Sequence, residues 1–260
     1  MASETSVKNA DGVEIWYDFD SSAKTASVTY KGESQYSYFG EYTGNVVIPS
    51  KVTYEGEEYS VTEIGDDAFR FCSSLTSITI PEGVTSIGDL TFYYCDHLTN
   101  ITIPENVTEI GKRAFSYCFS LTSIDVASNN NNYTSINGVL FSKDKTILIK
   151  YPEGKKDVTS YAIPEGVTKI VDYAFSVCTL TSITLPEGLT KIGSYAFYLC
   201  TLTSITIPKG VTEIGEHAFD GCSSLTSITI PESVTEIGDW AFYDCRSLTS
   251  IDVALDNNSY

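Results

Sequence analysis

Seven cysteines are the residues whose type and spacing point most directly to chemistry. They fall in two runs with a spacing of 22 or 23 residues: Cys72, Cys95, Cys118, then Cys178, Cys200, Cys222 and Cys245. An odd number at one repeat position argues against a disulfide framework, because equivalent side chains in stacked units point the same way. No CxxC pair or histidine cluster offers convergent metal ligands. We therefore expect a column of buried, reduced thiols.

The two histidines do not suggest a catalytic site. His97 and His217 stand at different repeat positions, and neither has a recurring serine, cysteine or aspartate partner. The glycines recur as turn residues, so there is no glycine-rich phosphate loop. Stacked glutamates such as Glu82 and Glu105 lack the dense oxygen ligands of a calcium loop. The sequence predicts no enzymatic activity, no cofactor and no metal.

A row of ring-bearing residues is the stronger candidate for binding. In the C-terminal half, the position before an Ala-Phe pair holds Tyr173, Tyr195, His217 and Trp240 in successive units. Aromatic residues are favoured at protein and sugar contacts. We predict that these four residues bind a partner, with Tyr195 and Trp240 pointing outward. The alternative, that the rings simply cover the core beneath them, stays open.

These rows exist because the chain repeats one phrase, LTSITIPEGVTEIG followed by AF..C. Nearly regular copies open at Leu75, Leu98, Val158, Leu180, Leu202 and Leu225, and a degenerate copy covers about 46–74. One unit is too small to bury its own apolar face, so the units must stack and share one core. The sequence predicts a right-handed repeat solenoid that is mostly β.

Each unit predicts a coil with three sides. The stretch 75–80 alternates so that its isoleucines point inward, until a proline ends the strand. After a Pro-Glu-Gly turn, 84–87 forms a second short strand. In 89–95, Phe92 and Cys95 face the core together if the segment makes one helical or 3₁₀ turn. Equivalent strands should pair in parallel between coils.

One phenylalanine per unit, preceded by alanine except at Phe92, should stack in one buried row: Phe69, Phe92, Phe115, Phe175, Phe197, Phe219 and Phe242. The pattern breaks between 125 and 157, where Phe141 is expected to continue the row. Two interpretations of the following residues stay open. Either 146–154 is a shortened unit in which Tyr151-Pro152 replaces Ile-Pro, or a hairpin projects around 142–145.

Upstream of the repeats the sequence predicts a β cap with strands at 13–17 and 26–30. We assign residues 1–45 to a flexible start and this cap, and 46–260 to one elongated solenoid with an irregular coil at 125–157. Because 121–133 leads into another module and 248–260 repeats its pattern, we expect the repeats to continue beyond the last residue.

Two other exposed rows compete as binding faces. A flat hydroxyl-rich sheet is explained by solubility and β-propensity alone; it is formed by Ser77, Asn100, Ser123, Ser182, Ser204 and Ser227 with Thr79, Thr102, Asp125, Thr184, Thr206 and Thr229. The other row follows the Val-Thr pair: Glu63, Ser86, Glu109, Lys169, Lys191, Glu213 and Glu236. In it, Lys191 beside Glu213 favours stacking, and Glu213 beside Glu236 opposes it.

The composition excludes several partners. Sixteen Lys and Arg against 34 Asp and Glu give a net charge of −18, which repels phosphate backbones and anionic lipids. We expect neither nucleic-acid binding nor direct membrane insertion, since no apolar stretch approaches bilayer length. The first eight residues have no signal-peptide character. The protein is therefore either cytosolic, or made with a secretion signal that this sequence lacks.

The repeated phrase resembles the BspA-like leucine-rich repeats of bacterial surface proteins. The resemblance is carried by LTSITIPEGVTEIG, the AF..C ending, and the interruption with Gly138–Phe141 and Tyr151-Pro152, over about 46–260. It departs from the common LxxLxLxxN/CxL pattern, because Gly83 stands at the Asn/Cys position. The resemblance implies a cell-surface or secreted protein of host-associated bacteria, often an adhesin, without catalytic residues.

Three functions therefore compete. An adhesin or protein interaction scaffold fits the repeat and the family, a carbohydrate-binding module fits the aromatic row, and a structural spacer fits an array that continues. We place the adhesin first, with a host or microbial surface protein as its partner and a glycan as the alternative ligand. Its expected location is extracellular or on the cell surface.

Overall fold

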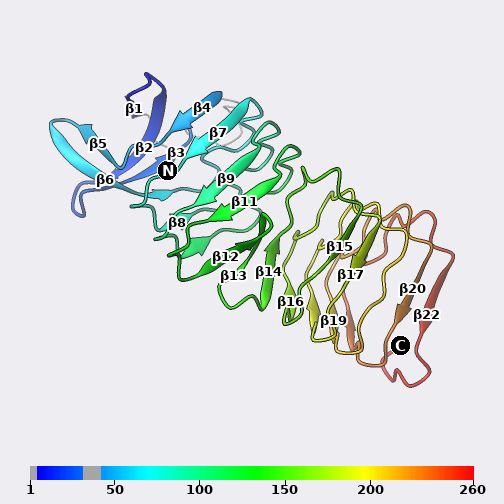
Figure 1. Ribbon diagram of the computed structural model, residues 1–260. Coiled ribbons are helices and arrows are strands. Elements are labelled where there is room, and N and C mark those ends of the chain that lie inside the picture. Colours follow the sequence, from blue (N-terminus) through cyan, green and yellow to red (C-terminus); the bar gives the residue numbers. More distant parts are fainter. Residues whose placement is uncertain (1–4, 32–41) are drawn as a thin grey trace. The chain divides into compact units, whose positions relative to one another are not determined.

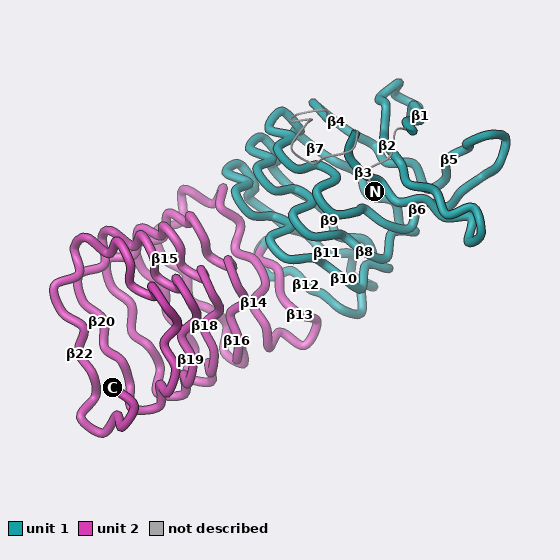
Figure 2. The backbone as a smooth tube through the Cα atoms, turned by 180° about the vertical axis from the view of Figure 1, so that it is seen from behind, with its two compact units in different colours: residues 1–138 teal, residues 139–260 magenta. Residues whose placement is uncertain are grey.

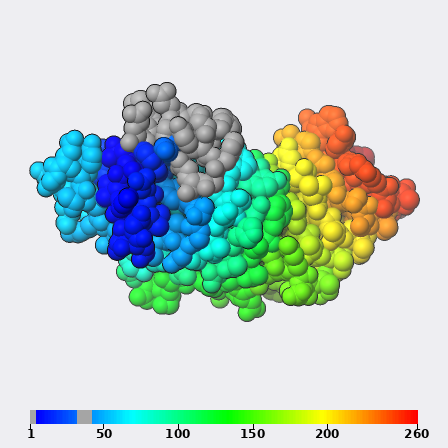
Figure 3. Space-filling model, turned by 90° about the horizontal axis from the view of Figure 1, so that it is seen from above, coloured from blue at the N-terminus to red at the C-terminus, as the bar shows by residue number. Residues whose placement is uncertain are grey.

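The computed structural model describes residues 5–31 and 42–260, and these form strands and turns without a helix (Figure 1). They divide into two compact units, residues 1–138 (unit 1) and 139–260 (unit 2) (Figure 2). Within each unit, coils adjacent in sequence lie adjacent in space, as the steady change of colour shows (Figure 3). The mostly β repeat solenoid is confirmed.

Unit 1 begins with the predicted cap. An antiparallel meander joins β1 (Ser6–Lys8), β2 (Glu14–Asp20) and β3 (Thr25–Thr29). Strand β3 pairs in parallel with β6 (Glu57–Ile64), which also forms an antiparallel hairpin with β5 (Lys51–Tyr54). The two cap strands read from the sequence are thus confirmed as β2 and β3. The parts of the predicted cap at 1–4 and 32–41 lie outside the described residues.

The coils of unit 1 stack through two sets of parallel strands. The first strands of the coils are β4 (Gly44–Val47), β7 (Leu75–Thr79), β9 (Asn100–Ile103) and β11 (Ser123–Val126). The second strands are β6, β8 (Ser86–Ile87) and β10 (Glu109–Ile110), and β12 (Tyr133–Ile136) follows them. Ile110 lies opposite Ile87, which lies opposite Ile64. The predicted parallel pairing between coils is therefore confirmed.

Unit 2 repeats this arrangement. One sheet contains β13 (Val139–Ser142), β14 (Ile147–Lys150), β16 (Lys169–Ile170), β18 (Lys191–Ile192), β19 (Glu213–Ile214) and β21 (Glu236–Ile237). Parallel pairs on the other face are β15 (Ser160–Ala162) with β17 (Ser182–Thr184), and β20 (Ser227–Ile230) with β22 (Ser250–Val253).

The irregular coil forms the hairpin, one of the two interpretations left open by the sequence. Strands β13 and β14 form an antiparallel hairpin, and β14 also pairs in parallel with β16, with Leu148 opposite Ile170. The shortened-unit interpretation placed Tyr151 at the isoleucine of Ile-Pro, and the structure shows that this placement is wrong. The Tyr151 ring stacks on Phe175 with centroids 5.3 Å apart. Phe141 is fully buried, but Tyr151 is the ring that extends the phenylalanine row.

The third side of each coil is a series of turns. Cys95 N donates to Phe92 O within the turn (3.2 Å), whereas Phe92 N donates to Ala114 O of the next coil (2.8 Å). Two residues per turn have positive φ, for example Leu90 (55°) and Tyr94 (62°). These left-handed positions interrupt helical geometry, so the predicted 3₁₀ turn is present only as isolated bonds between residues three apart.

The phenylalanines stack face to face in each unit. Neighbouring centroids are 5.1–5.7 Å apart and the planes lie within 17° of parallel, in Phe69, Phe92 and Phe115 of unit 1 and in Phe175, Phe197, Phe219 and Phe242 of unit 2. The Tyr42 ring packs against Phe69 at 4.6 Å, tilted by 44°. Phe242 is half-buried, which corrects the prediction of a uniformly buried row. Among the described residues it stacks on Phe219 alone.

The cysteines are free, and all except the half-buried Cys245 are buried. A thiol typically donates to the phenylalanine carbonyl of the preceding coil, as Cys95 Sγ does to Phe69 O (3.1 Å); Cys118, Cys200, Cys222 and Cys245 do the same. Burial raises the pKa of the Cys95, Cys200 and Cys222 thiols, and raises that of Cys245 to about 11. A hydrogen bond with Cys200 lowers the pKa of Cys178. The predicted column of buried thiols is confirmed for six cysteines and corrected for Cys245, which lies half-buried.

Two equivalent asparagines close matching segments of the two units. Asn130 Nδ2 donates to Pro104 O (2.7 Å) and Val107 O (3.0 Å). Asn257 makes the same bonds to Pro231 O (2.9 Å) and Val234 O (3.0 Å). The similarity of 121–133 and 248–260 therefore extends from sequence to hydrogen bonding.

The aromatic stacks predict a graded loss of stability. Phe197 is fully buried between Phe175 and Phe219, so Phe197→Ala should lower the free energy of unfolding by about 3–5 kcal/mol, through lost burial and an uncollapsed cavity. Phe242→Ala, which removes a half-buried ring with one stacking neighbour, should cost clearly less. Urea unfolding of the two variants measures the difference. Equal losses would contradict the stacked core.

The thiol column predicts an order of chemical labelling. Cys245 should react first with iodoacetamide in the native protein, because it is the only half-buried cysteine of the seven. Its rate should rise with pH toward about 11, where its thiolate forms. The other cysteines should react only after unfolding. Mass spectrometry of each site checks this, and native labelling of Cys95 as fast as that of Cys245 would be inconsistent with it.

Candidate functional site

The residues predicted to bind a partner lie together on the turn side of unit 2. Tyr173, Tyr195, His217 and Trp240, here called the aromatic row, have φ values of 53–60°. The next coil holds the backbones of the first three, since Tyr173 N donates to Ser194 O (3.0 Å), Tyr195 N to Glu216 O (2.9 Å) and His217 N to Asp239 O (2.9 Å). Successive coils therefore present one ring each at the same repeat position.

The rings of the aromatic row stack on one another. Tyr173 and Tyr195 are 4.7 Å apart with planes at 4°, and Tyr195 and His217 are 4.6 Å apart at 13°. Trp240 continues the stack at 6.3 Å and 9°. Stacking covers the faces of the inner rings and leaves mainly their edges at the surface.

Exposure increases toward the C-terminal end of the row. Trp240 is 61% exposed, and Tyr243, which meets it edge-on at 5.2 Å, is 55% exposed. Tyr173, Tyr195 and His217 are half-buried. Trp240 thus points outward as expected, whereas Tyr195 lies half-buried between two rings. That the four residues bind a partner stays a prediction.

His217 is held by carboxylates. Its Nδ1 lies 2.7 Å from Asp220 Oδ2, and its Nε2 lies 3.7 Å from Glu216 Oε1. No nucleophilic side chain of the described residues is hydrogen-bonded to this imidazole. In unit 1, His97 Nδ1 contacts the Ser73 carbonyl at 2.6 Å. Neither histidine belongs to a nucleophile and base arrangement.

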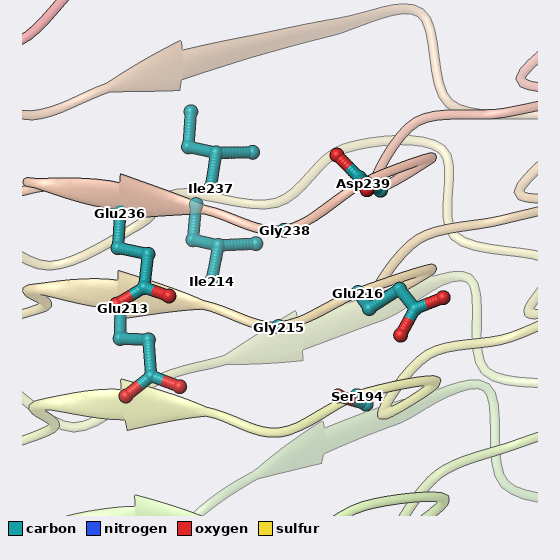
Figure 4. A pocket seen from close by; sticks show the side chains of 9 residues that line it. All are labelled: Ser194, Glu213, Ile214, Gly215, Glu216, Glu236, Ile237, Gly238 and Asp239. Atoms are coloured by element: carbon teal, nitrogen blue, oxygen red, sulfur yellow. The ribbon is translucent and has the colours of Figure 1, made fainter.

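Residues of the same coils line an open acidic depression (Figure 4). Glu213 and Glu236 line one side of it, and Glu216 and Asp239 line the other. Glu213 forms the predicted ion pair with Lys191, and Glu236 lies next to Glu213 in register. Within residues 5–31 and 42–260, no group of three or more His, Cys, Asp or Glu side chains is arranged to hold a metal ion.

Sequence reasoning missed an aromatic cluster in unit 1. Its rings are Phe71, Tyr93, Tyr94, Tyr117 and Phe119, with Tyr94 stacked on Tyr117 at 4.8 Å. The Arg70 guanidinium lies 4.9 Å from the Phe71 ring, and that of Arg113 lies 4.9 Å from the Tyr93 ring. A signal was available, because Phe71, Tyr94 and Tyr117 each follow a core phenylalanine by two residues.

The hydroxyl-rich sheet lies where it was expected, on the outer face of the first strands. Asp125 lies opposite Thr102, and Ser182 lies opposite both Ser160 and Ser204. Its threonines are exposed. The neighbouring threonines have a structural role that the sequence did not reveal, since Thr203 Oγ1 donates to Thr181 O of the preceding coil (3.2 Å).

Comparison with known proteins identifies the repeat. A family model described as the BspA type leucine rich repeat region matches residues 57–162 and 153–259, in six copies. The chain belongs to this family. The aromatic row and the unit 1 cluster therefore lie on turns of BspA-type repeats.

Solved structures share the BspA-type fold. A leucine rich cell surface protein from Faecalibacterium prausnitzii is 27% identical, over 97% of this chain and 95% of that one, with a TM-score of 0.54. A leucine-rich repeat protein from Eubacterium ventriosum is 24% identical, over 95% and 85%, with a TM-score of 0.58. The pneumococcal vaccine antigen PcpA is 20% identical, over 98% and 90%, with a TM-score of 0.59. No curated protein matches the chain.

The described part of this BspA-type chain contains no helix of the length and apolarity that crossing a bilayer requires.

The left-handed backbone of the aromatic row predicts which substitutions it tolerates. Tyr195 has φ 56°, a conformation that asparagine adopts readily and a β-branched residue does not. Tyr195→Asn and Tyr195→Val lose the same ring contacts, so Val should lower the free energy of unfolding by about 1–2 kcal/mol more than Asn. Chemical denaturation measures this difference. Equal stability of the two variants would argue against the left-handed turn.

Proposed function

We propose that this protein is a non-catalytic binding protein of the bacterial cell surface, an adhesin or protein interaction scaffold, and that the aromatic row of unit 2 contacts its partner. The observation that carries this proposal is Trp240, 61% exposed at the end of a ring stack on a hydrogen-bonded turn. Tryptophan and tyrosine supply much of the contact energy of protein interfaces. A rigid backbone reduces the ordering cost of binding.

The family supports the surface location. The chain belongs to the BspA-type repeats, and the similar protein from F. prausnitzii is described as a cell surface protein. Repeat solenoids commonly bind through extended arrays of equivalent positions. The turn side of unit 2 offers such an array.

A protein partner is favoured over a glycan by the stacking itself. An aromatic platform for a sugar needs an open ring face, and neighbouring rings at 4.6–4.7 Å cover the faces of Tyr195. Trp240 is the exposed platform at the end of the row. Carbohydrate binding therefore stays the second candidate, because this one indole is available for it.

The proposal predicts which surface carries binding energy. Tyr195→Asn with Trp240→Asn should weaken binding to any partner of the wild-type protein by about 30-fold or more, equivalent to about 2 kcal/mol. The assay is surface binding to a panel of immobilised extracellular matrix proteins and bacterial cells, with a glycan array run in parallel. Binding confined to the glycan array would favour the second candidate.

Two matched controls make this test specific. Phe71→Asn with Tyr94→Asn removes two rings from positive-φ positions of unit 1, and should leave binding unchanged. Thr184→Lys, Thr206→Lys and Thr229→Lys together disrupt the hydroxyl-rich sheet. Loss of binding in the threonine variant alone would move the site to that sheet. Melting curves confirm that each variant is folded.

A further inference from the structure

One pair of cysteines in unit 2 is in direct contact through its sulfur atoms. Cys178 Sγ and Cys200 Sγ, in neighbouring coils, are 3.0 Å apart, and both residues are 1% exposed. Cys200 Sγ also donates to Phe175 O at 2.9 Å. Equivalent residues of stacked coils lie about 4.8 Å apart, which is within the Cα separation that a disulfide spans. The two sulfur atoms can therefore bond without a large backbone movement.

The irregular coil explains why Cys178 differs from the thiols that follow it. The Tyr151 ring stacks on Phe175 and its backbone N donates to Ala174 O (2.9 Å), so Tyr151 occupies the phenylalanine position of the irregular coil. Three residues later, where a regular coil has cysteine, stands Gly154. Cys178 is therefore the first thiol of the column in unit 2, with no cysteine at the equivalent position of the coil before it.

The surroundings of Cys178 favour its thiolate. A hydrogen bond from Cys200 lowers the pKa of Cys178 and outweighs the opposing effect of burial. The Leu180 N–H and the Lys150 ammonium lower this pKa further, and Glu153 opposes them. Burial raises the pKa of Cys200 instead. Of the two thiols, Cys178 is thus suited to act as the nucleophile and Cys200 as the proton donor.

A buried hydroxyl lies near the same thiol. Tyr151 is 2% exposed, and its Oη has no hydrogen-bond partner within residues 5–31 and 42–260. Burial, and after it the neighbouring Cys178, raises the pKa of this phenol. The phenol is therefore a donor available to an oxygen atom added to the Cys178 sulfur.

We propose that Cys178 and Cys200 are a redox-active dithiol, which a small peroxide oxidises to a disulfide between two neighbouring coils. The Cys178 thiolate attacks one oxygen of hydrogen peroxide, so that the O–O bond breaks, hydroxide leaves and a sulfenic acid forms. The Cys200 sulfur then attacks the Cys178 sulfur. An S–S bond forms, and the sulfenic oxygen leaves as water with the Cys200 proton.

This reaction converts two thiols and one hydrogen peroxide into one disulfide and two water molecules, so each sulfur loses one electron and the peroxide gains two. The disulfide ties together the coils that carry Tyr173 and Tyr195. It does not depend on whether those rings bind a partner, so it stands apart from the proposed function.

Disulfide mapping tests this proposal in the native chain. The protein is treated with hydrogen peroxide, which needs less opening of the coils than iodoacetamide does, and then with catalase. It is next unfolded in N-ethylmaleimide and cleaved with trypsin. Lys169, Lys191 and Lys209 place the two cysteines on separate peptides, 170–191 and 192–209. These peptides should be recovered joined, lighter than their sum by two hydrogen atoms. Recovery of both as unlinked peptides overturns the proposal.

Equivalent pairs of thiols serve as matched controls. Cys95 with Cys118, and Cys200 with Cys222, have the same repeat positions, but burial raises the pKa of the first thiol in each pair. The Cys178 pair should form its disulfide faster than either control by about tenfold or more. Equal rates for the three pairs overturn the proposal, because stacking alone would then decide which thiols are oxidised.

Two single variants test which sulfur reacts first. Cys200→Ser keeps a hydroxyl donor beside Cys178, so peroxide should leave a sulfenic acid on Cys178, which dimedone traps when it is added as the chain unfolds. In Cys178→Ser, Cys200 should stay a thiol. Melting curves show whether each variant is folded. Dimedone on Cys200 in the second variant, as fast as on Cys178 in the first, overturns the proposed order of steps.

Discussion

The backbone hydrogen bonds between successive coils are the constraint on which the rest of the structure depends. Phe197 N, for example, donates to Ala218 O at 2.8 Å. A rise of about 4.8 Å per coil places equivalent phenylalanines in stacking distance and brings each thiol to a carbonyl of its neighbour. Where glycine follows the second strand it also leaves no room for a side chain, since a Cβ on Gly215 would lie 2.5 Å from Ser194 N. Phe, Cys and Gly therefore recur for one reason, which is the close approach of neighbouring coils.

Because the core positions are constrained in this way, chemical variety is concentrated on the turns. The position two residues before the core phenylalanine holds Asp67, Leu90 and Arg113 in unit 1, but rings in the regular coils of unit 2. All have positive φ, so their side chains leave the coil in the same direction. In unit 1 the guanidinium of Arg70 contacts a ring and a carboxylate, whereas in unit 2 the Trp240 indole is exposed. The two units therefore offer chemically different surfaces on one scaffold.

The coil, the phenylalanine stacks and the thiol column could be predicted from the sequence, because burial follows a period that the repeat makes visible. The position of Tyr151 could not be predicted. It depends on the hairpin of β13 and β14, which places β14 beside β16, a second strand, rather than among the first strands of the coils. The left-handed turns were also missed, because tyrosine and histidine seldom adopt positive φ without such bonds to a neighbouring coil. Burial of Tyr195 follows from the rise between coils, which sequence alone does not give, and the unit 1 cluster combines positions that are adjacent only after stacking.

The irregular coil helps to position the aromatic row, although in the sequence it is recognisable only as an interruption of the repeat. Lys150 Nζ lies 2.7 Å from Glu153 Oε1, and these side chains are only 6% and 0% exposed. Burying such a pair carries a desolvation cost that its attraction only partly offsets, so stability alone does not explain it. The same ammonium donates to Tyr173 O at 3.3 Å, and Tyr173 is the first ring of the row. The irregular coil therefore contributes the buried ammonium of Lys150, which hydrogen-bonds to the backbone of Tyr173, where the aromatic row begins.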